Sequence, residues 1–125
     1  MNKYYLPVVL LCALGLSACA IGYQARGRIS DVSGEMRGKG YPNLAGGGRF
    51  IFSDPSGTVQ CDGIANPPKG ILNPESCLGE KGTGKALCTD GREFLFSWAA
   101  VSCRAWKGSG TDAKGNQLEF RVERN

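Results

Sequence analysis

The sequence predicts a small all-β domain, a disulfide-stapled antiparallel meander of β-hairpin repeats that follows a flexible N-terminal tether. Three observations predict it. Three stretches of the chain share one pattern of glycines, short runs and turns. Glycine supplies 19 of the 125 residues, more than twice its usual share of about 7%, which indicates many turns. Four cysteines fall within the region of the repeats, at positions 61, 77, 88 and 103.

The three related stretches each begin with Gly-x-Gly and continue with a short run, a turn and a second run. Runs rich in β-branched and aromatic residues, bounded by glycine and Asp-Gly, are typical of strands. The pattern therefore predicts one β-hairpin repeated three times. The stretches are Gly46–Cys61, Gly82–Trp98 and Gly108–Glu123, with turns at 54–57, 90–91 and 114–116.

The second stretch gives the most detailed expectation. Asp90-Gly91 is predicted to form a type I′ turn, which sets Leu87 opposite Phe94. Because side chains alternate along a strand, Phe94, Phe96 and Trp98 share one face. We expect that face to be the core; the alternative is a platform on which a ligand stacks.

The same stretch resembles a MORN repeat, a hairpin that runs Gly-x-Gly, about six residues, Asp-Gly and then an aromatic residue. The resemblance rests on Gly82, Gly84, Asp90, Gly91, Phe94 and Trp98. Phe96 departs from the pattern, because a glycine usually stands there. The resemblance covers about seventeen residues and implies hairpin architecture without implying a function.

The N-terminus has the parts of a secretion signal. Lys3 lies in a short polar start, and the apolar run Leu6–Leu16 has about half of the roughly twenty residues that a transmembrane helix needs. Leu16-Ser17-Ala18-Cys19 follows and resembles the bacterial lipobox, Leu–small–small–Cys. An ordinary cleaved signal near Cys19 is the alternative.

The lipobox resemblance implies that residues 1–18 are removed and that Cys19 carries a diacylglyceryl group, often with a further acyl chain (a palmitate-type modification). Two or more chains would anchor the protein firmly to a membrane. In enteric-type bacteria an Asp after this cysteine retains a lipoprotein in the inner membrane; Ala20 stands here, which implies the outer membrane. The predicted organisation is thus a signal at 1–18, a lipidated flexible tether at 19–40 and a β-hairpin domain at 41–125.

The four remaining cysteines are predicted to form two disulfides, as is usual in small exported domains. A metal site is disfavoured, because no Cys-x-x-Cys pair and no histidine occurs. In a meander, Cys61 and Cys88 lie on neighbouring strands, which favours Cys61–Cys88 with Cys77–Cys103. The sequential pairing, Cys61–Cys77 with Cys88–Cys103, is the rival.

Gly63–Lys81 is expected to be a long loop, because its three prolines prevent regular ladder pairing. Long loops in compact domains are often functional. This loop, held by Cys77, is therefore the expected place for a partner contact.

No catalytic site, metal site or cofactor is predicted. The chain has no histidine and no Gly-x-Ser-x-Gly motif. A glycosidase needs two carboxylates that face each other across a cleft. The spacing of the candidate carboxylates along the chain does not indicate such a pair; they are Asp62, Glu75, Glu80, Asp90 and Glu93. The net charge of +4 is mild and does not favour nucleic-acid binding.

The sequence therefore favours a membrane-anchored, non-enzymatic envelope component that binds a protein or an envelope polymer. One alternative is a surface inhibitor or exclusion factor. A glycan-binding or glycan-hydrolysing protein is the remaining one.

Overall fold

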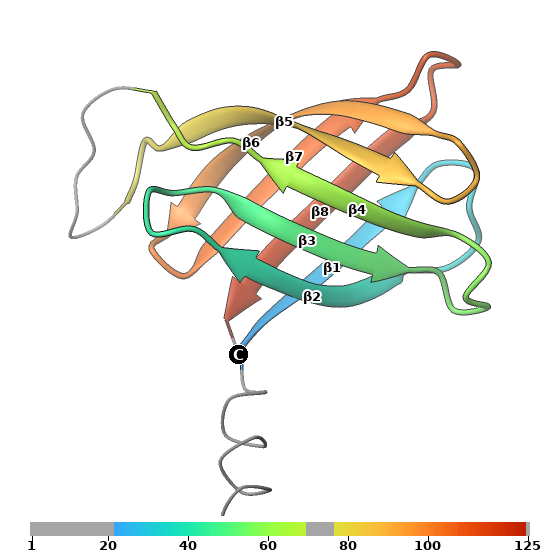
Figure 1. Ribbon diagram of the computed structural model, residues 1–125, viewed down its shortest axis with the longest axis horizontal. Coiled ribbons are helices and arrows are strands. Elements are labelled where there is room, and N and C mark those ends of the chain that lie inside the picture. The colour runs from blue at the N-terminus through green and yellow to red at the C-terminus, as the bar shows by residue number, and fades with distance from the viewer. Residues whose placement is uncertain (1–21, 70–76, 125) are drawn as a thin grey trace, which may run out of the picture.

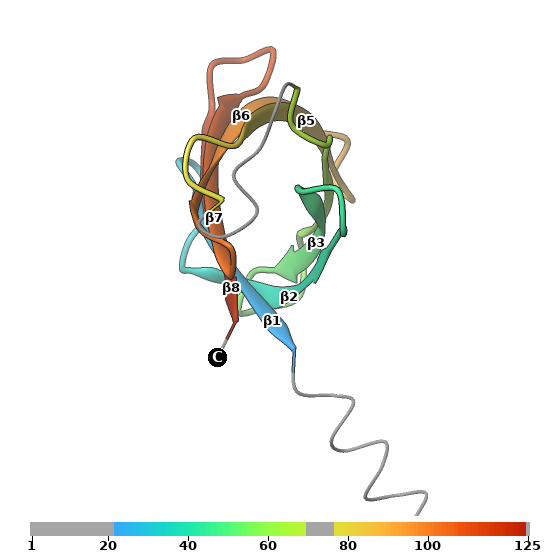
Figure 2. The same cartoon turned by 90° about the vertical axis from the view of Figure 1, so that its left-hand side faces the viewer.

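The computed structural model describes residues 22–69 and 77–124, which form eight β-strands. Each strand is antiparallel to the next, and β1 also pairs with β8, so the meander closes into a barrel (Figures 1 and 2). The strands are β1 (Tyr23–Ile29), β2 (Met36–Pro42), β3 (Gly48–Ser53), β4 (Gln60–Ala65), β5 (Lys81–Cys88), β6 (Glu93–Ser102), β7 (Ala105–Thr111) and β8 (Gln117–Arg124). The all-β antiparallel meander is confirmed, whereas closure was not predicted from the sequence.

The predicted tether over residues 19–40 is wrong from Tyr23 onward. β1 and β2 form a complete hairpin, and β1 occupies the place between β2 and β8 that closes the barrel. Both strands, Tyr23–Ile29 and Met36–Pro42, fall within or overlap the stretch assigned to the tether. Residues 19–21 lie outside the described residues. The folded domain thus begins about eighteen residues before position 41.

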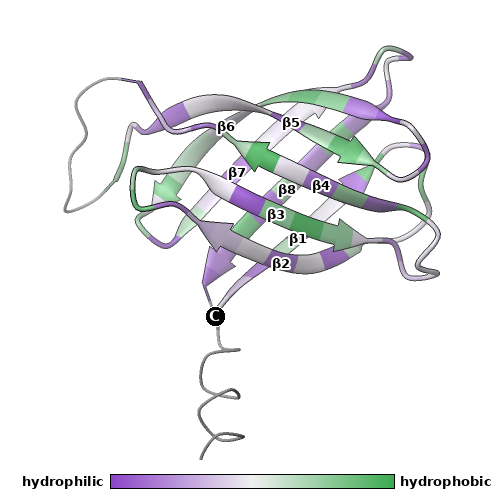
Figure 3. Ribbon diagram, in the orientation of Figure 1, coloured by the Kyte–Doolittle hydropathy of each residue, from purple (hydrophilic) through white to green (hydrophobic). Residues whose placement is uncertain are grey.

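The three hairpins expected from the repeats are β3–β4, β5–β6 and β7–β8. Phe94, Phe96 and Trp98 all point into the barrel and are at most 3% exposed, as expected for the core. The residues between them, including Leu95 at 63% exposure, point outward. The alternation of hydrophobic and hydrophilic positions is visible along the strands in Figure 3.

The turn between β5 and β6 differs from the expected type I′ turn. Gly91 has a φ of 91°, and Asp90 does not share that left-handed conformation. The Cys88 N–H donates to the Arg92 carbonyl at 2.9 Å, which leaves a three-residue loop. Such loops combine a type I turn with a left-handed glycine. The register consequently shifts by one residue, so Leu87 pairs with Glu93 instead of Phe94 and is 54% exposed.

Aromatic rings fill the barrel, and glycines make room for them. An eight-stranded barrel is just wide enough for side chains to fill it. Three phenylalanines each have a glycine directly across on both neighbouring strands. The triplets are Gly40–Phe50–Gly63, Gly84–Phe96–Gly110 and Gly27–Phe120–Gly108. This explains Gly-x-Gly at Gly82–Gly84 on β5 and Gly108–Gly110 on β7, and β2 has the same pattern at Gly38–Gly40. Gly46 of the first repeat differs, because it lies in the turn between β2 and β3.

The rings contact one another across the barrel axis. Phe50 stacks on Phe120 with ring centroids 4.3 Å apart, and Phe96 meets Phe120 edge-on at 4.8 Å. Trp106 packs beside Phe50 and Phe120 at 5.9 and 5.7 Å. Offset and edge-on arrangements are the favourable geometries for such pairs. The interior is therefore a packed core.

Both disulfides have the pairing favoured by the sequence, Cys61–Cys88 and Cys77–Cys103. Cys61 and Cys88 are directly opposite on β4 and β5, with Cα atoms 4.0 Å apart. The second disulfide joins the segment before β5 to the tight turn between β6 and β7. The strand-order argument for the pairing is thus confirmed.

Candidate functional site

The carboxylates singled out in the sequence lie on separate parts of the barrel. Asp62 pairs with Arg49 on the outer face of β3 and β4, at 2.5 Å, and this hydrogen-bonded guanidinium lowers the Asp62 pKa. Glu93 pairs with Lys85 at 3.0 Å. These two carboxylates serve as surface ion-pair partners. Glu75 lies outside the described residues.

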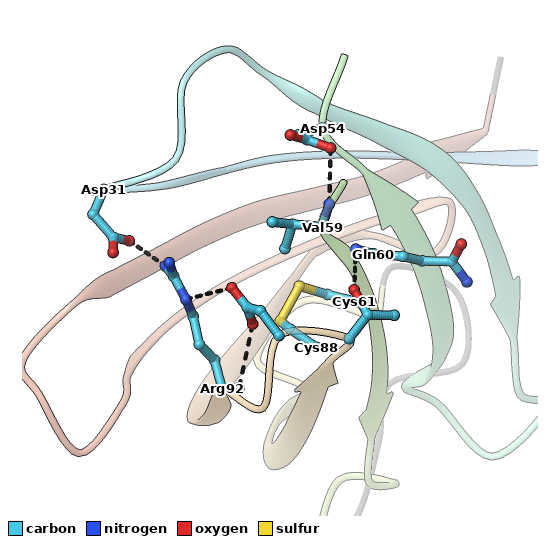
Figure 4. The surroundings of a disulfide bond; sticks show 9 residues. Asp31, Asp54, Val59, Gln60, Cys61, Cys88 and Arg92 are labelled. Atoms are coloured by element: carbon cyan, nitrogen blue, oxygen red, sulfur yellow. Dashed lines mark hydrogen bonds and ion pairs between the residues drawn. A yellow bond between two sulfur atoms is a disulfide. The ribbon is translucent and has the colours of Figure 1, made fainter. Parts of the chain in front are cut away.

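Asp90 belongs to the barrel end that holds the hairpin turns. Arg92 pairs there with Asp90 at 2.8 Å and with Asp31 of the β1–β2 turn (Figure 4). Asp54 accepts a hydrogen bond from the Val59 N–H at 3.0 Å in the neighbouring turn. The buried Cys61–Cys88 disulfide lies close by. These contacts tie the turns together, so we assign this end a structural role.

Glu80 lies at the opposite end, where the chain enters β1. It is 8% exposed and borders a hollow of about 270 Å³ together with Trp106 and the Cys77–Cys103 disulfide. The indole N–H of Trp106 has no hydrogen-bond partner among the described residues. The predicted contact loop starts from this end, and its residues 70–76 are outside the described part of the chain.

A groove of about 970 Å³ lies on the outside of the barrel. It crosses five adjacent strands in the order β1, β8, β7, β6 and β5. At about 4.8 Å between strands, this corresponds to a length of about 20 Å. Sequence reasoning did not foresee a cleft, because it did not foresee closure by β1.

A row of basic side chains, which we call the cation row, crosses four strands, and three of its four members line the groove, Arg37 being the exception. The strand registers place its residues directly opposite one another: Arg37 with Arg26, Arg26 with Arg121, and Arg121 with Lys107. All four residues are exposed. Arg37 and Arg121 have ion pairs only with Glu35 and Glu123, two positions away along the chain. Arg26 and Lys107 have no ion pair among the described residues.

The part of the groove on β6 and β7 has a floor of small residues. Lys107 is opposite Ala99, which is opposite Lys81, so Lys81 continues the line of the cation row beyond Ala99. In the next row, Ser109 and Ser97 are directly opposite each other across β7 and β6. This row continues through Glu119 of β8 to Arg28 of β1. With Glu35 and Glu123, the groove lining has five basic and three acidic residues, so it offers hydroxyl groups beside a net positive charge of +2.

Charge is distributed unevenly over the barrel. Strands β1, β2, β7 and β8 carry seven basic and two acidic residues, a net of +5. Strands β3 to β6 carry three basic and two acidic residues, a net of +1. The four hairpin turns at the Arg92 end carry five acidic and two basic residues, a net of −3. The net charge of the whole chain, +4, does not indicate this uneven distribution.

The cysteines are the site residues that the structure brings together. Cys61, Cys88, Cys77 and Cys103 are joined as two disulfides, while Cys19, the predicted lipidation site, lies outside the described residues. Within residues 22–69 and 77–124, no cluster of three potential metal ligands occurs. No helix in that part of the chain is long and apolar enough to cross a membrane. Comparison of the chain with models of known protein families, with curated proteins and with solved structures gives no match.

Proposed function

We propose that this protein is a bacterial envelope lipoprotein, anchored through Cys19 to the outer membrane, that acts by binding and not by catalysis. The observation that carries the anchor is Leu16-Ser17-Ala18-Cys19 at the end of an apolar run. Only three residues separate Cys19 from β1. An anchored barrel would therefore be held close to the membrane surface.

Two features of the barrel support an exported binding protein. Its two disulfides suit an oxidising compartment outside the cytoplasm. Its interior is packed with aromatic rings, so a partner would be met on the outer surface. The groove beside the cation row, with a volume of about 970 Å³, offers space for a partner on that surface.

Substitution of Cys19 tests the anchor. We expect the full chain to fractionate with the outer membrane and Cys19→Ser to accumulate as unprocessed precursor or as soluble protein. Cys12→Ser is the matched control, because Cys12 would leave with the signal. Ala20→Asp should move the protein to the inner membrane of an enteric-type host. Unchanged fractionation of Cys19→Ser would refute the anchor.

A further inference from the structure

We propose that the groove binds a linear anionic polymer, one that carries carboxylate or phosphate groups along its chain. The inference deepens the proposed function and rests on it for the compartment in which such a polymer is met. The binding elements are four basic residues that line the groove in one line across the strands, together with the small residues Ala99, Ser97 and Ser109 beside them. The basic residues are Arg26, Arg121, Lys107 and Lys81.

The cation row is the first support for an anionic ligand. Like charges directly opposite on neighbouring strands destabilise a sheet. Here Arg26 faces Arg37 on one side and Arg121 on the other, and Arg121 also faces Lys107. Four adjacent strands thus hold cations in one line, of which only Arg37 and Arg121 have an acidic partner among the described residues. A polyanion laid along that line would relieve the repulsion.

The shape of the site favours a chain over a flat surface. The groove includes the small residues Ala99, Ser97 and Ser109, and Lys107 and Lys81 stand on either side of Ala99. A planar bilayer would meet the long basic side chains and leave these small residues uncovered. An extended polymer can enter the groove, place its anionic groups along the line of basic residues and hydrogen-bond to the serine hydroxyls.

The charge polarity restricts where a polyanion can bind. The four hairpin turns at the Arg92 end carry a net charge of −3 and would repel a polyanion. Strands β3 to β6 carry a net charge of only +1. The wall formed by β1, β2, β7 and β8, with +5, is the favourable surface. Binding should accordingly weaken with added salt, because exposed charges are screened beyond about 10 Å at 0.1 M ionic strength.

The test uses a soluble chain that begins at residue 20, which retains all eight strands and lacks the anchor cysteine. Fluorescein-labelled polygalacturonate and polyphosphate are the carboxylate and phosphate probes, and neutral dextran is the uncharged probe. We expect anisotropy titrations to show saturable binding of at least one polyanion and none of dextran. Absence of binding to both polyanions would overturn the proposal.

A charge-matched pair of variants locates the site. Neutralising Arg26, Lys107 and Arg121 to Gln should weaken binding by about tenfold to a hundredfold, because each exposed ion contact contributes a factor of about two to five. The control neutralises three cations outside the groove and changes the net charge equally. Those cations are Arg49, Lys85 and Lys114. Equal weakening by both variants would overturn the site.

A bulky floor residue separates a polymer in the groove from adsorption to a bilayer. Ser109→Trp fills the floor without changing charge and should abolish polymer binding, whereas Thr111→Trp, on the same strand outside the groove, should not. Circular dichroism checks that each variant is folded. If the chain binds phosphatidylglycerol vesicles but neither polymer, the cation row faces a membrane and the proposal is wrong.

The two proposals fail in different experiments. Polymer binding by the chain from residue 20 does not require lipid, so it can be present even if Cys19→Ser fractionates as wild type. Conversely, if the protein is lipidated but the chain from residue 20 binds neither polyanion, the proposed anchor stands and the proposed ligand is wrong.

Discussion

Inward glycines are the residues on which the packing of this barrel depends most directly. Phe50 lies at the centre of the aromatic core, stacked on Phe120. Gly63 on β4 is directly opposite Phe50, and a Cβ at Gly63 would lie 2.2 Å from a ring carbon of Phe50. The ring cannot withdraw without disturbing Phe120 and Phe96. A single methyl group at this position therefore conflicts with the core.

Gly63→Ala should lower the free energy of unfolding by about 1–3 kcal/mol or more, the range for overpacked cores. Urea unfolding followed by circular dichroism measures the change. Gly22→Ala is the control, because no atom lies within 4 Å of the added Cβ, and it should be nearly neutral. Equal stability of the two variants would mean that the interior is looser than the ring contacts indicate.

Aspartates at the hairpin turns are a second case in which single residues matter. Asp112 accepts hydrogen bonds from the Asn116 side chain at 2.9 Å and from the backbone N–H groups of Asn116 and Lys114 at 2.8 and 2.9 Å. These bonds favour the charged carboxylate and lower the Asp112 pKa. Hydrogen bonds from the Val59 N–H and the Ser56 hydroxyl likewise lower the Asp54 pKa.

The lowered pKa values predict acid sensitivity. A carboxylate with a depressed folded pKa contributes stability that is complete above the unfolded pKa of about 3.9 and is lost as pH falls through the folded value. Asp112→Asn and Asp54→Asn should therefore destabilise the barrel at pH 7 and differ progressively less from wild type below pH 4. Thermal unfolding from pH 2 to pH 7 tests this. A difference independent of pH would contradict the assigned role of the charge.

At the scale of elements, the sequence predicts a hairpin well where large residues alternate along a strand. The second hairpin shows this, because Phe94, Phe96 and Trp98 have the period of a strand with one buried face. β1 and β2 were missed because the inward residues in the middle of the hairpin are small, such as Ala25 and Gly38, and only Ile29 and Met36 next to its turn are large and fully buried. Aromatic rings from other strands fill the space above them. Hydrophobic alternation, the main signal of a half-buried strand, is therefore weak in both.

The turn and the disulfides show how element-scale reasoning depends on register. Asp90-Gly91 correctly predicted a turn, but the loop has one residue more than expected, so Leu87 points to solvent and not into the core. The prediction of the Cys61–Cys88 disulfide was still correct, because it required only that β4 and β5 be neighbours. Order along the sheet is thus easier to predict from sequence than register.

The two disulfides should contribute unequally. They close similar loops, with sequence separations of 27 and 26 residues, so chain entropy alone gives each about 3.5 kcal/mol. Cys61 and Cys88 are also buried in the core, whereas Cys103 is exposed. Replacing both Cys61 and Cys88 with Ala should therefore destabilise the barrel more than replacing both Cys77 and Cys103.

Denaturant titration of the two double variants measures the difference, and partial reduction gives an independent check. A mild reductant should open Cys77–Cys103 first, since one of its cysteines is accessible to solvent. Peptide mapping after alkylation reads the order. Earlier opening of Cys61–Cys88 would contradict the assigned burial.

At the scale of the molecule, the candidate groove could not be predicted from the sequence, because it combines strands from both ends of the chain. Arg26 and Arg121 are 95 positions apart and become neighbours only when β1 pairs with β8. The overall charge of +4 gives no indication of a wall with +5 and a turn end with −3. What the sequence does provide is the hairpin repeat, the core face of β6 and the disulfide pairing.

Closure by β1 is the feature on which both the packed interior and the cation row depend. Hydrogen exchange measured by mass spectrometry on Tyr23–Ile29 tests it most directly, since β1 is hydrogen-bonded to β2 on one side and to β8 on the other. Amides in such a central position should be protected as strongly as those of Gln117–Arg124 in β8. Exchange of Tyr23–Ile29 within seconds, while β8 stays protected, would show that this segment is a tether and that the barrel is open.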